Sequence, residues 1–190
     1  MLKTLSSLLR RREGATAAEF ALAAPVLILL AAGIVEIGSF LFALALLEAG
    51  VREASRFGIT GREAVAGTSR ETTIRTIVVA NGIGLINNAN LQVQVTVYPG
   101  FSQIGQPEPF IDQSPFNGAH DAGEPFTDVN GNGTWDADMG VAGAGGAGDV
   151  VVYTLTYPWR LLTGLLGPAL GDQLTLRASI AVRNEPYPEP

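Results

Sequence analysis

Cysteine is absent from this chain of 190 residues, and histidine occurs only once, at His120. Without cysteine the chain has no disulfide framework, no thiolate metal site and no thiol nucleophile, and no G-x-S-x-G motif supplies a serine nucleophile. Charged residues make up only 16% of the chain. The distal half has few basic residues (Arg160, Arg177 and Arg183), so it lacks the concentrated basic face that nucleic-acid binding requires. We therefore expect neither an enzyme nor a nucleic-acid-binding protein.

Apolar residues, in contrast, are abundant. They make up 47% of the chain, which is high for a soluble domain and too low for a protein that crosses a membrane several times. The length leaves room for one soluble domain and an appended segment. The formal net charge is -6, and many of the acids cluster between Glu108 and Asp149. The composition therefore predicts one membrane anchor and one acidic domain.

A long apolar run covers residues 17–47 and is interrupted only by Glu19, Glu36 and Ser39. As a helix it would be about 45 Å long at roughly 1.5 Å per residue, which exceeds the roughly 30 Å hydrocarbon core of a bilayer. The run predicts a membrane-spanning segment within an N-terminal helix over residues 15–58. Glu36 then falls near the outer interface, where a carboxylate costs less than at the centre.

Beyond the span the sequence predicts an α+β domain. The helix becomes amphipathic, and we expect its apolar stripe to pack on the chain's own domain (Leu47, Val51, Ala54 and Ser55). A capping box at residues 68–71 predicts a second helix that closes near Asn81. Alternating apolar residues in 91–97, 151–157 and 174–182 predict three strands of a small antiparallel sheet against the protruding helix.

Two connections do not fit a regular element. The Gly-, Pro- and Asp-rich insertion at residues 100–148 is far longer than an ordinary loop, so we expect it to be either functional or disordered. Its end, GVAGAGGAG at residues 140–148, is typical of a flexible linker. The apolar segment WRLLTGLLGPALG, residues 159–171, leaves two interpretations open, a short helix or a docking loop.

Basic residues precede the span (Lys3, Arg10, Arg11 and Arg12). They favour a cytoplasmic N-terminus. Gly14 offers an unhindered peptide bond at the cytoplasmic face of the membrane, where a protease can reach it. We expect a cytoplasmic leader over residues 1–14, and an extracytoplasmic domain over residues 59–190.

The segment GATAAEFALAAPVLILLAAGIVEIG, residues 14–38, resembles the N-terminus of the TadE-like family, the pilin-like proteins of bacterial tight-adherence (Flp) pilus systems. The family pattern is a glycine, small residues, Glu-Phe, Ala-Leu, a proline and an aliphatic run. It is matched here by Gly14, Glu19, Phe20, Ala21, Leu22 and Pro25. Ile37 replaces the usual aromatic residue and Ser55 replaces an alanine. The resemblance implies a pilin-like fold with a long N-terminal helix.

The resemblance also implies that a prepilin peptidase cuts after Gly14 and makes Ala15 the new N-terminus. Glu19, with Phe20 beside it, would then meet the N-terminal amine of a neighbouring subunit during assembly. The implied partners are the peptidase, other pilin or pseudopilin subunits, the pilus assembly machinery and the membrane. The implied location is the bacterial inner membrane or a surface pilus. From the residues alone, Glu19 has a second interpretation, as a marker of the lipid–water boundary.

The sequence DVNGNGTWDAD, residues 128–138, follows part of the pattern of a calcium-binding loop. The candidate ligands occupy alternate positions (Asp128, Asn130, Asn132, Thr134 and Asp136). Position twelve is Met139 and not the bidentate glutamate, while Asp121 and Glu124 upstream offer further oxygen ligands. The pattern makes Ca²⁺ the candidate cofactor, and a turn-rich loop without metal is the alternative left open.

These features together predict a structural protein, a minor pilin or pseudopilin that assembles through its N-terminal helix. The alternative is a membrane-anchored binding module whose loop is ordered by calcium. A hydrolase built on Asp121 and Asp136 ranks third. We expect a solvated His120, a Trp135 that anchors the insertion or a partner surface, and a Trp159 packed in the core.

Overall fold

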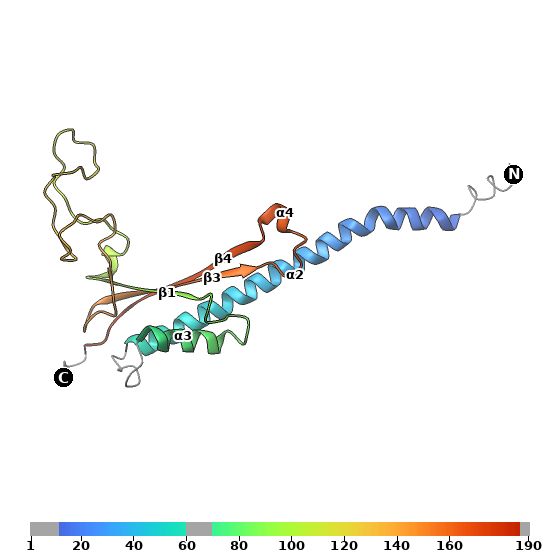
Figure 1. Cartoon of the computed structure of the whole chain (residues 1–190), viewed down its shortest axis with the longest axis horizontal. Helices are drawn as coiled ribbons and strands as arrows, with labels where there is room; N and C mark the ends of the chain where they lie inside the picture. Colours follow the sequence, from blue (N-terminus) through green and yellow to red (C-terminus); the bar gives the residue numbers. More distant parts are fainter. Residues whose placement is uncertain (1–11, 60–69, 187–190) are drawn as a thin grey trace. The chain divides into compact units, whose positions relative to one another are not determined.

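The computed structural model describes residues 12–59 and 70–186, and Figure 1 shows its elements along the chain. These are α2 (Arg12–Ile59), α3 (Arg70–Asn81), β1 (Gln92–Tyr98), the short 3₁₀ helix η1 (Phe101–Gln103), β2 (Val141–Ala142), β3 (Val150–Arg160), α4 (Gly167–Leu170) and β4 (Gln173–Arg183). The leader residues 1–11 and residues 68–69 of the predicted capping box lie outside the described residues.

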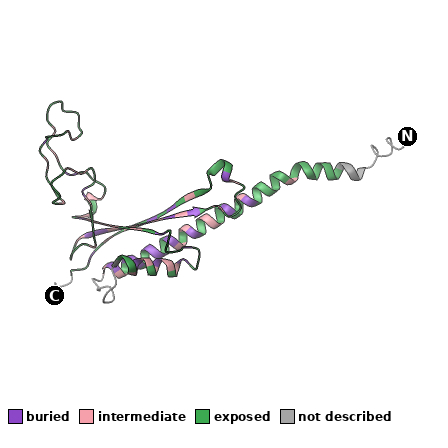
Figure 2. Ribbon diagram, in the orientation of Figure 1, coloured by how far each residue is buried: buried purple, intermediate pink, exposed green. Residues whose placement is uncertain are grey.

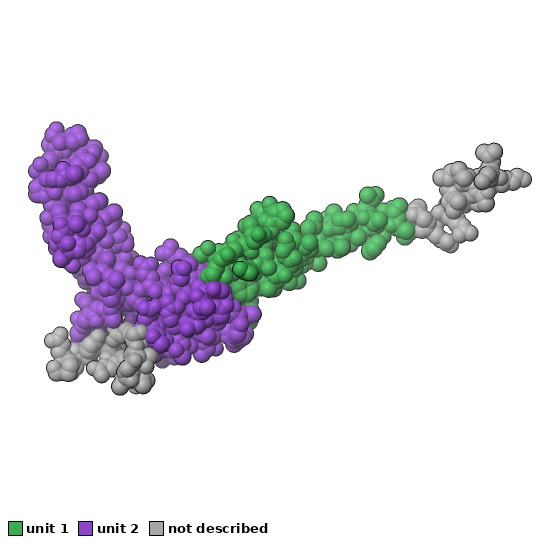
Figure 3. Space-filling model, in the orientation of Figure 1, with its two compact units in different colours: residues 1–42, 158–175 green, residues 43–157, 176–190 purple. Residues whose placement is uncertain are grey.

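The chain divides into two compact units, coloured separately in Figure 3. One unit combines residues 1–42 with residues 158–175, so it pairs the N-terminal part of α2 with the connection between β3 and β4. The other unit combines residues 43–157 with residues 176–190 and contains α3, β1, β2 and the insertion. The predicted boundaries at residues 14 and 58 concern processing and membrane topology, and they stay predictions.

The strands form one four-stranded sheet in the order β2-β1-β3-β4. β1 runs antiparallel to both β2 and β3, and Val95 faces Tyr153 across the β1–β3 pair. Along β3 every second residue is buried, as the alternation predicts (Val151, Tyr153, Leu155 and Tyr157). The predicted α+β fold with a long apolar helix and a small antiparallel sheet is confirmed. The short strand β2, which comes from the insertion, is an addition to it.

The part of α2 in the same unit as most of the sheet has a buried stripe. Leu47, Val51 and Ala54 are at most 2% exposed. At Gly58 the helix and the sheet approach so closely that a Cβ atom would lie 2.0 Å from the hydroxyl oxygen of Tyr153. The amphipathic stripe therefore packs on the chain's own sheet, as the sequence predicts.

Helix α3 packs beside α2 at a position that lacks a side chain. A Cβ atom on Gly50 of α2 would lie 3.2 Å from the Cα atom of Val78, which is fully buried. The turn after α3 is hydrogen-bonded to Tyr157 of β3. The Tyr157 hydroxyl donates to the Leu85 carbonyl at 3.3 Å and accepts from the Asn87 side-chain amide at 3.1 Å. The second predicted helix thus covers part of the same core.

The N-terminal part of α2 has no such burial. Residues 16–31 are exposed apart from the half-buried Ala24, and Figure 2 shows this stretch as an exposed helix. Pro25 lies inside the helix without ending it. The segment Thr16–Ile59 is long and apolar enough to cross a membrane. The helix therefore has the length and composition that the sequence predicts for a membrane-spanning segment.

Candidate functional site

The predicted processing site lies near the N-terminal end of the described part of α2. Gly14 and Ala15 have helical backbone, because they lie within Arg12–Ile59. A protease that binds an extended chain therefore has to unwind the helix locally to reach the bond after Gly14. Cleavage itself remains a prediction.

The predicted assembly residues lie where α2 is exposed. Glu19 is exposed and Phe20 is 66% exposed. Glu19 follows Ala15 by one helical turn, because positions four apart are neighbours on a helix. The same stretch exposes further large apolar side chains (Leu22, Val26, Leu27, Ile28, Leu29 and Leu30). A carboxylate therefore marks the start of an exposed apolar surface, where a cation from another molecule would be its natural partner.

Glu36 differs from Glu19, because its side chain is buried at 2% exposure on the same helix. Its donors come from the connection between β3 and β4, in the same compact unit. The N–H group of Leu162 donates to Glu36 Oε2 at 2.9 Å, and the Thr163 hydroxyl donates to Oε1 at 2.7 Å. The N–H group of Thr163 also donates to Oε1. Glu36 thus binds a turn of the chain through successive backbone N–H groups and one hydroxyl, as anion-binding turns do.

The sequence predicts Glu36 near the outer interface of the membrane, which stays a prediction, and it does not predict the partner of this carboxylate. The available signal was the carboxylate itself, because a charged group inside an apolar helix requires donors. The donors could not be read from the sequence, since two of them are backbone N–H groups 126 and 127 residues further along the chain.

Glu108 organises the acidic loop, although it was not among the predicted ligands. Its side chain is fully buried, and Oε1 accepts from the N–H groups of Val129 at 2.7 Å and Asn130 at 3.2 Å. Oε2 accepts from the N–H group of Asp136 at 3.2 Å. The indole N–H of Trp135 donates to the Glu108 carbonyl at 2.9 Å, which confirms that Trp135 anchors the insertion. One buried carboxylate thus fixes both ends of the 128–136 loop.

The carboxylates predicted to bind calcium accept hydrogen bonds from the loop. Asp128 Oδ1 accepts from the N–H group of Gly131 at 2.6 Å, and its Oδ2 accepts from that of Gly133 at 2.8 Å. Asp136 Oδ2 accepts from the side-chain amides of Asn130 at 2.6 Å and Asn132 at 2.5 Å. These contacts build tight turns of the kind that Asp and Asn side chains favour.

The remaining predicted ligand, Thr134, joins the same network, because its N–H group and hydroxyl both donate to Asn132 Oδ1. The structure therefore brings all five predicted ligands together in one loop. Among the described residues, no group of three or more His, Cys, Asp or Glu side chains is arranged to hold a metal ion. Calcium binding by this loop stays a prediction.

Glu124, the further candidate ligand, organises a neighbouring turn. Its side chain is 8% exposed and accepts from the N–H groups of Gln113 at 2.7 Å and Asp121 at 2.9 Å. The N–H groups of Asp121 and Gln113 lower the pKa of the Glu124 carboxyl below its ordinary value, against the opposing effect of burial. The carboxylate is therefore used inside its own segment, as an acceptor for backbone groups.

His120 was expected to be solvated, and the structure shows it half-buried. Its ring stacks on Trp135 with centroids 4.5 Å apart and an interplanar angle of 11°. Phe110 and Phe126 contact the same ring edge-on at 5.5 and 5.8 Å. The insertion therefore has a small aromatic cluster of its own, which composition alone could not show because its members are spread over 26 positions.

The prediction of a flexible linker at residues 140–148 is wrong. Val141 and Ala142 form β2 against β1. The side-chain amide of Asn184, which is 1% exposed, donates to the carbonyls of Ala144 and Gly146 at 3.0 Å each. The glycines permit the turns, but hydrogen bonds from a distant residue fix the path of the chain.

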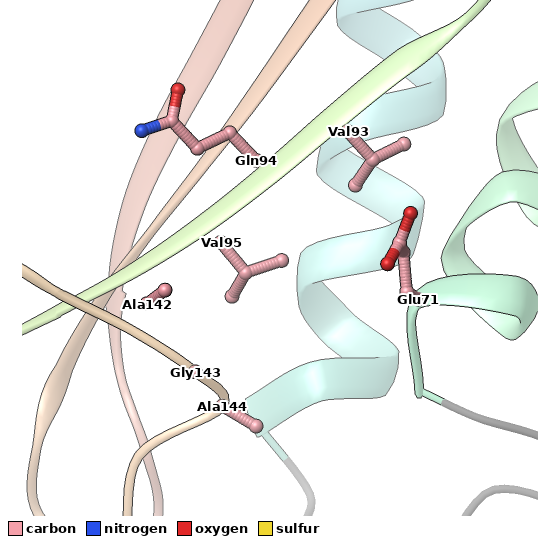
Figure 4. A pocket seen from close by; sticks show the side chains of 7 residues that line it. All are labelled: Glu71, Val93, Gln94, Val95, Ala142, Gly143 and Ala144. Carbon is pink, nitrogen blue, oxygen red and sulfur yellow. The ribbon is translucent and has the colours of Figure 1, made fainter.

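A cavity of about 380 Å³ lies between α3 and the β1–β2 edge of the sheet (Figure 4). Its wall is mainly small and apolar, and Glu71 supplies the acidic group (the lining residues are Glu71, Val93, Gln94, Val95, Ala142, Gly143 and Ala144). Glu71 forms an ion pair with Arg75 at 2.8 Å.

The sequence profile of the family described as TadE-like protein matches residues 14–56. The matched range lies within α2, so the resemblance is confirmed for the N-terminal helix. A search of curated proteins and a search of solved structures returned no match.

Proposed function

Starting from this TadE-like helix, we propose that the protein is a minor pilin or pseudopilin-like structural component of a tight-adherence (Flp) type IV pilus system. It is anchored in the bacterial inner membrane with residues 59–190 outside the cytoplasm, and it assembles through α2 after a prepilin peptidase removes residues 1–14. The observation that supports this most strongly is the exposed apolar surface of residues 16–31, which includes Glu19 and Phe20 and lies within the family match.

The mechanism follows from what each part of α2 exposes. Residues 16–31 bury almost nothing inside the chain, so they are free to contact lipid and then the helices of other subunits. Cleavage after Gly14 creates an ammonium group on Ala15. The Glu19 carboxylate of one subunit pairs with the ammonium of the next, because a charge in apolar surroundings needs an opposite charge. The C-terminal part of α2, with its buried stripe, stays packed on the sheet.

The alternative proposal is a membrane-anchored binding module with a calcium-ordered loop. Both proposals require the span, and they differ at the N-terminus. A simple anchored module has no use for cleavage at Gly14 or for a charge pair at Glu19. A test at Glu19 therefore separates them.

The test is the variant Glu19→Ala, made in the full chain and compared with Glu53→Ala, an exposed glutamate in the C-terminal part of the same helix. A photo-crosslinking residue at Leu22, which is 81% exposed, reports contacts with other subunits. We expect Glu19→Ala to reach the membrane normally but to lose cross-links at least about tenfold, since removing one member of a buried charge pair costs roughly 3–5 kcal/mol. Glu53→Ala should behave as the unmodified chain, and equal yields from all three proteins would contradict the proposal.

A further inference from the structure

The connection between β3 and β4, residues 161–172, exposes apolar side chains that the packing of the sheet does not need. We call it the hairpin tip. Leu162 is 61% exposed, and Leu165 and Leu170 are each 49% exposed. The short helix α4 lies within this connection. Three exposed leucines in so short a segment indicate a contact with an apolar environment outside the chain.

Glu36 fixes the position of the hairpin tip along α2. Its carboxylate accepts from the backbone N–H groups of Leu162 and Thr163, and all three residues belong to one compact unit. Figure 1 shows α4 within the connection between β3 and β4. The leucines of the tip therefore lie at the level of Glu36 and of the exposed helix residues Ile34 and Ile37.

The position of Glu36 along α2 corresponds to a membrane boundary. Residues 17–36 in helical conformation extend about 30 Å at roughly 1.5 Å per residue, which equals the thickness of the hydrocarbon core. If the exposed apolar stretch of α2 fills the core, Glu36 reaches its outer edge. The hairpin tip, bound to Glu36, is then at the edge as well.

We infer that the hairpin tip inserts its leucines into the outer boundary of the lipid bilayer and that Glu36 couples this contact to the spanning helix. The inference rests on the membrane-spanning role in the proposed function. The occupant is lipid because the exposed leucines continue the exposed apolar surface of α2, where the hydrocarbon lies. Arg160, which is exposed just before the tip, suits the phosphate level of such a surface. Of the two interpretations left open by the sequence, the short helix is present as α4, and the docking loop is part of this inference.

The experiment uses the absence of cysteine, which allows single labels on the full chain. An environment-sensitive fluorophore is attached to Leu165→Cys, to Leu29→Cys in the middle of the span, and to Val129→Cys in the acidic loop. Each protein is reconstituted in vesicles of phosphatidylcholine and phosphatidylglycerol. Lipids with a quencher close to the headgroup or close to the chain end then report the depth of each label.

We expect the label at residue 165 to be quenched several-fold more strongly by the headgroup-proximal quencher than the label at residue 129, whose emission should match that in water. The label at residue 29 should respond most to the deep quencher. Addition of Glu36→Gln should reduce quenching at residue 165 and leave residue 29 unchanged. The same pattern with Leu170→Cys gives a second reading in case one variant folds poorly.

Other outcomes separate the inference from the proposed function. A deep label at residue 29 with a water-like label at residue 165 overturns the inference and leaves the span intact. Water-like labels at both residues overturn the span, and with it the proposed function. If residue 165 is shielded without lipid quenching, and only at high protein density, the leucines contact another protein copy and the inference is also overturned.

Discussion

Buried glutamates fix the irregular parts of this chain. Glu36, Glu108 and Glu124 each accept hydrogen bonds from backbone N–H groups of segments that lie outside helices and strands. A buried N–H group without an acceptor costs about as much as a lost hydrogen bond, so an irregular segment needs acceptors of this kind. At each of these sites a side-chain carboxylate accepts the hydrogen bonds that backbone carbonyls accept in a helix or sheet.

The first prediction at this scale concerns Glu36→Gln. Glutamine keeps one oxygen acceptor, but it loses the negative charge and turns an N–H₂ group towards the donors of the hairpin tip. We expect a local loss of about 1–3 kcal/mol, which corresponds to amide exchange at Leu162 and Thr163 that is faster by roughly 5- to 150-fold. Hydrogen exchange on the full chain in lipid nanodiscs measures this directly.

The matched control is Glu48→Gln on the same helix. Glu48 is exposed and pairs with Arg52 at 3.0 Å, and exposed pairs of this kind contribute little. Its substitution should leave exchange in the hairpin tip unchanged. If Glu36→Gln also leaves Leu162 and Thr163 protected, the carboxylate is not what binds the tip.

The surroundings of Glu36 show which features can be predicted from the sequence and which cannot. The apolar run predicts a position for Glu36 near the outer edge of a membrane, because helical rise converts position into depth, and this stays a prediction. It did not predict the Thr163 contact, because a backbone N–H group has no signature in the sequence. The same reason explains why Glu108 was counted only as one acid in a cluster. Periodicity records which residues are buried, but it does not record which carboxylate accepts from which turn.

At the scale of elements, the long helices and the three long strands were predicted, and the path of the insertion was not. The alternation along β3 predicted its buried residues, because successive side chains of a strand point to opposite faces. The glycine-rich end of the insertion was expected to be flexible, yet it forms β2 and is bound by Asn184. Asn184 lies 40 residues beyond Ala144, so local composition contained no sign of it.

The prediction at the element scale concerns calcium and the 128–136 loop. The loop lacks an acidic residue at position twelve, where Met139 is buried at 5% exposure. We expect calcium, if it binds here, to show the weak affinity of extracellular sites, with a dissociation constant of roughly 10⁻⁴ to 10⁻³ M. Removal of calcium should leave the loop folded, because Glu108 binds its backbone independently of metal.

Fluorescence of Trp135, which contacts the Glu108 carbonyl, provides the titration signal on the full chain. Asp128→Asn should abolish the response to calcium, while Asp172→Asn, outside the loop, should preserve it. A response that survives Asp128→Asn places any calcium elsewhere. No response in the unmodified chain leaves the loop as a set of turns.

At the scale of the whole molecule, one helix serves two purposes. The C-terminal part of α2 is a core element, with Leu47 and Val51 buried against the sheet unit. The N-terminal part presents apolar side chains to the outside over residues 16–31. An exposed apolar surface of this kind suits the proposed role, in which the subunit contacts lipid before it contacts other subunits in a pilus.

The central claim is that this helix is processed and then used for assembly, and the mass of the mature chain tests it most directly. The protein is expressed in cells with and without the cognate prepilin peptidase, and its intact mass is measured after purification from membranes. The variant Gly14→Val, which adds a branched side chain next to the scissile bond, serves as the matched control. With the peptidase, the account predicts an unmodified chain that begins at Ala15 and a Gly14→Val chain that is not shortened. An unshortened chain of natural sequence in peptidase-positive cells would contradict the account.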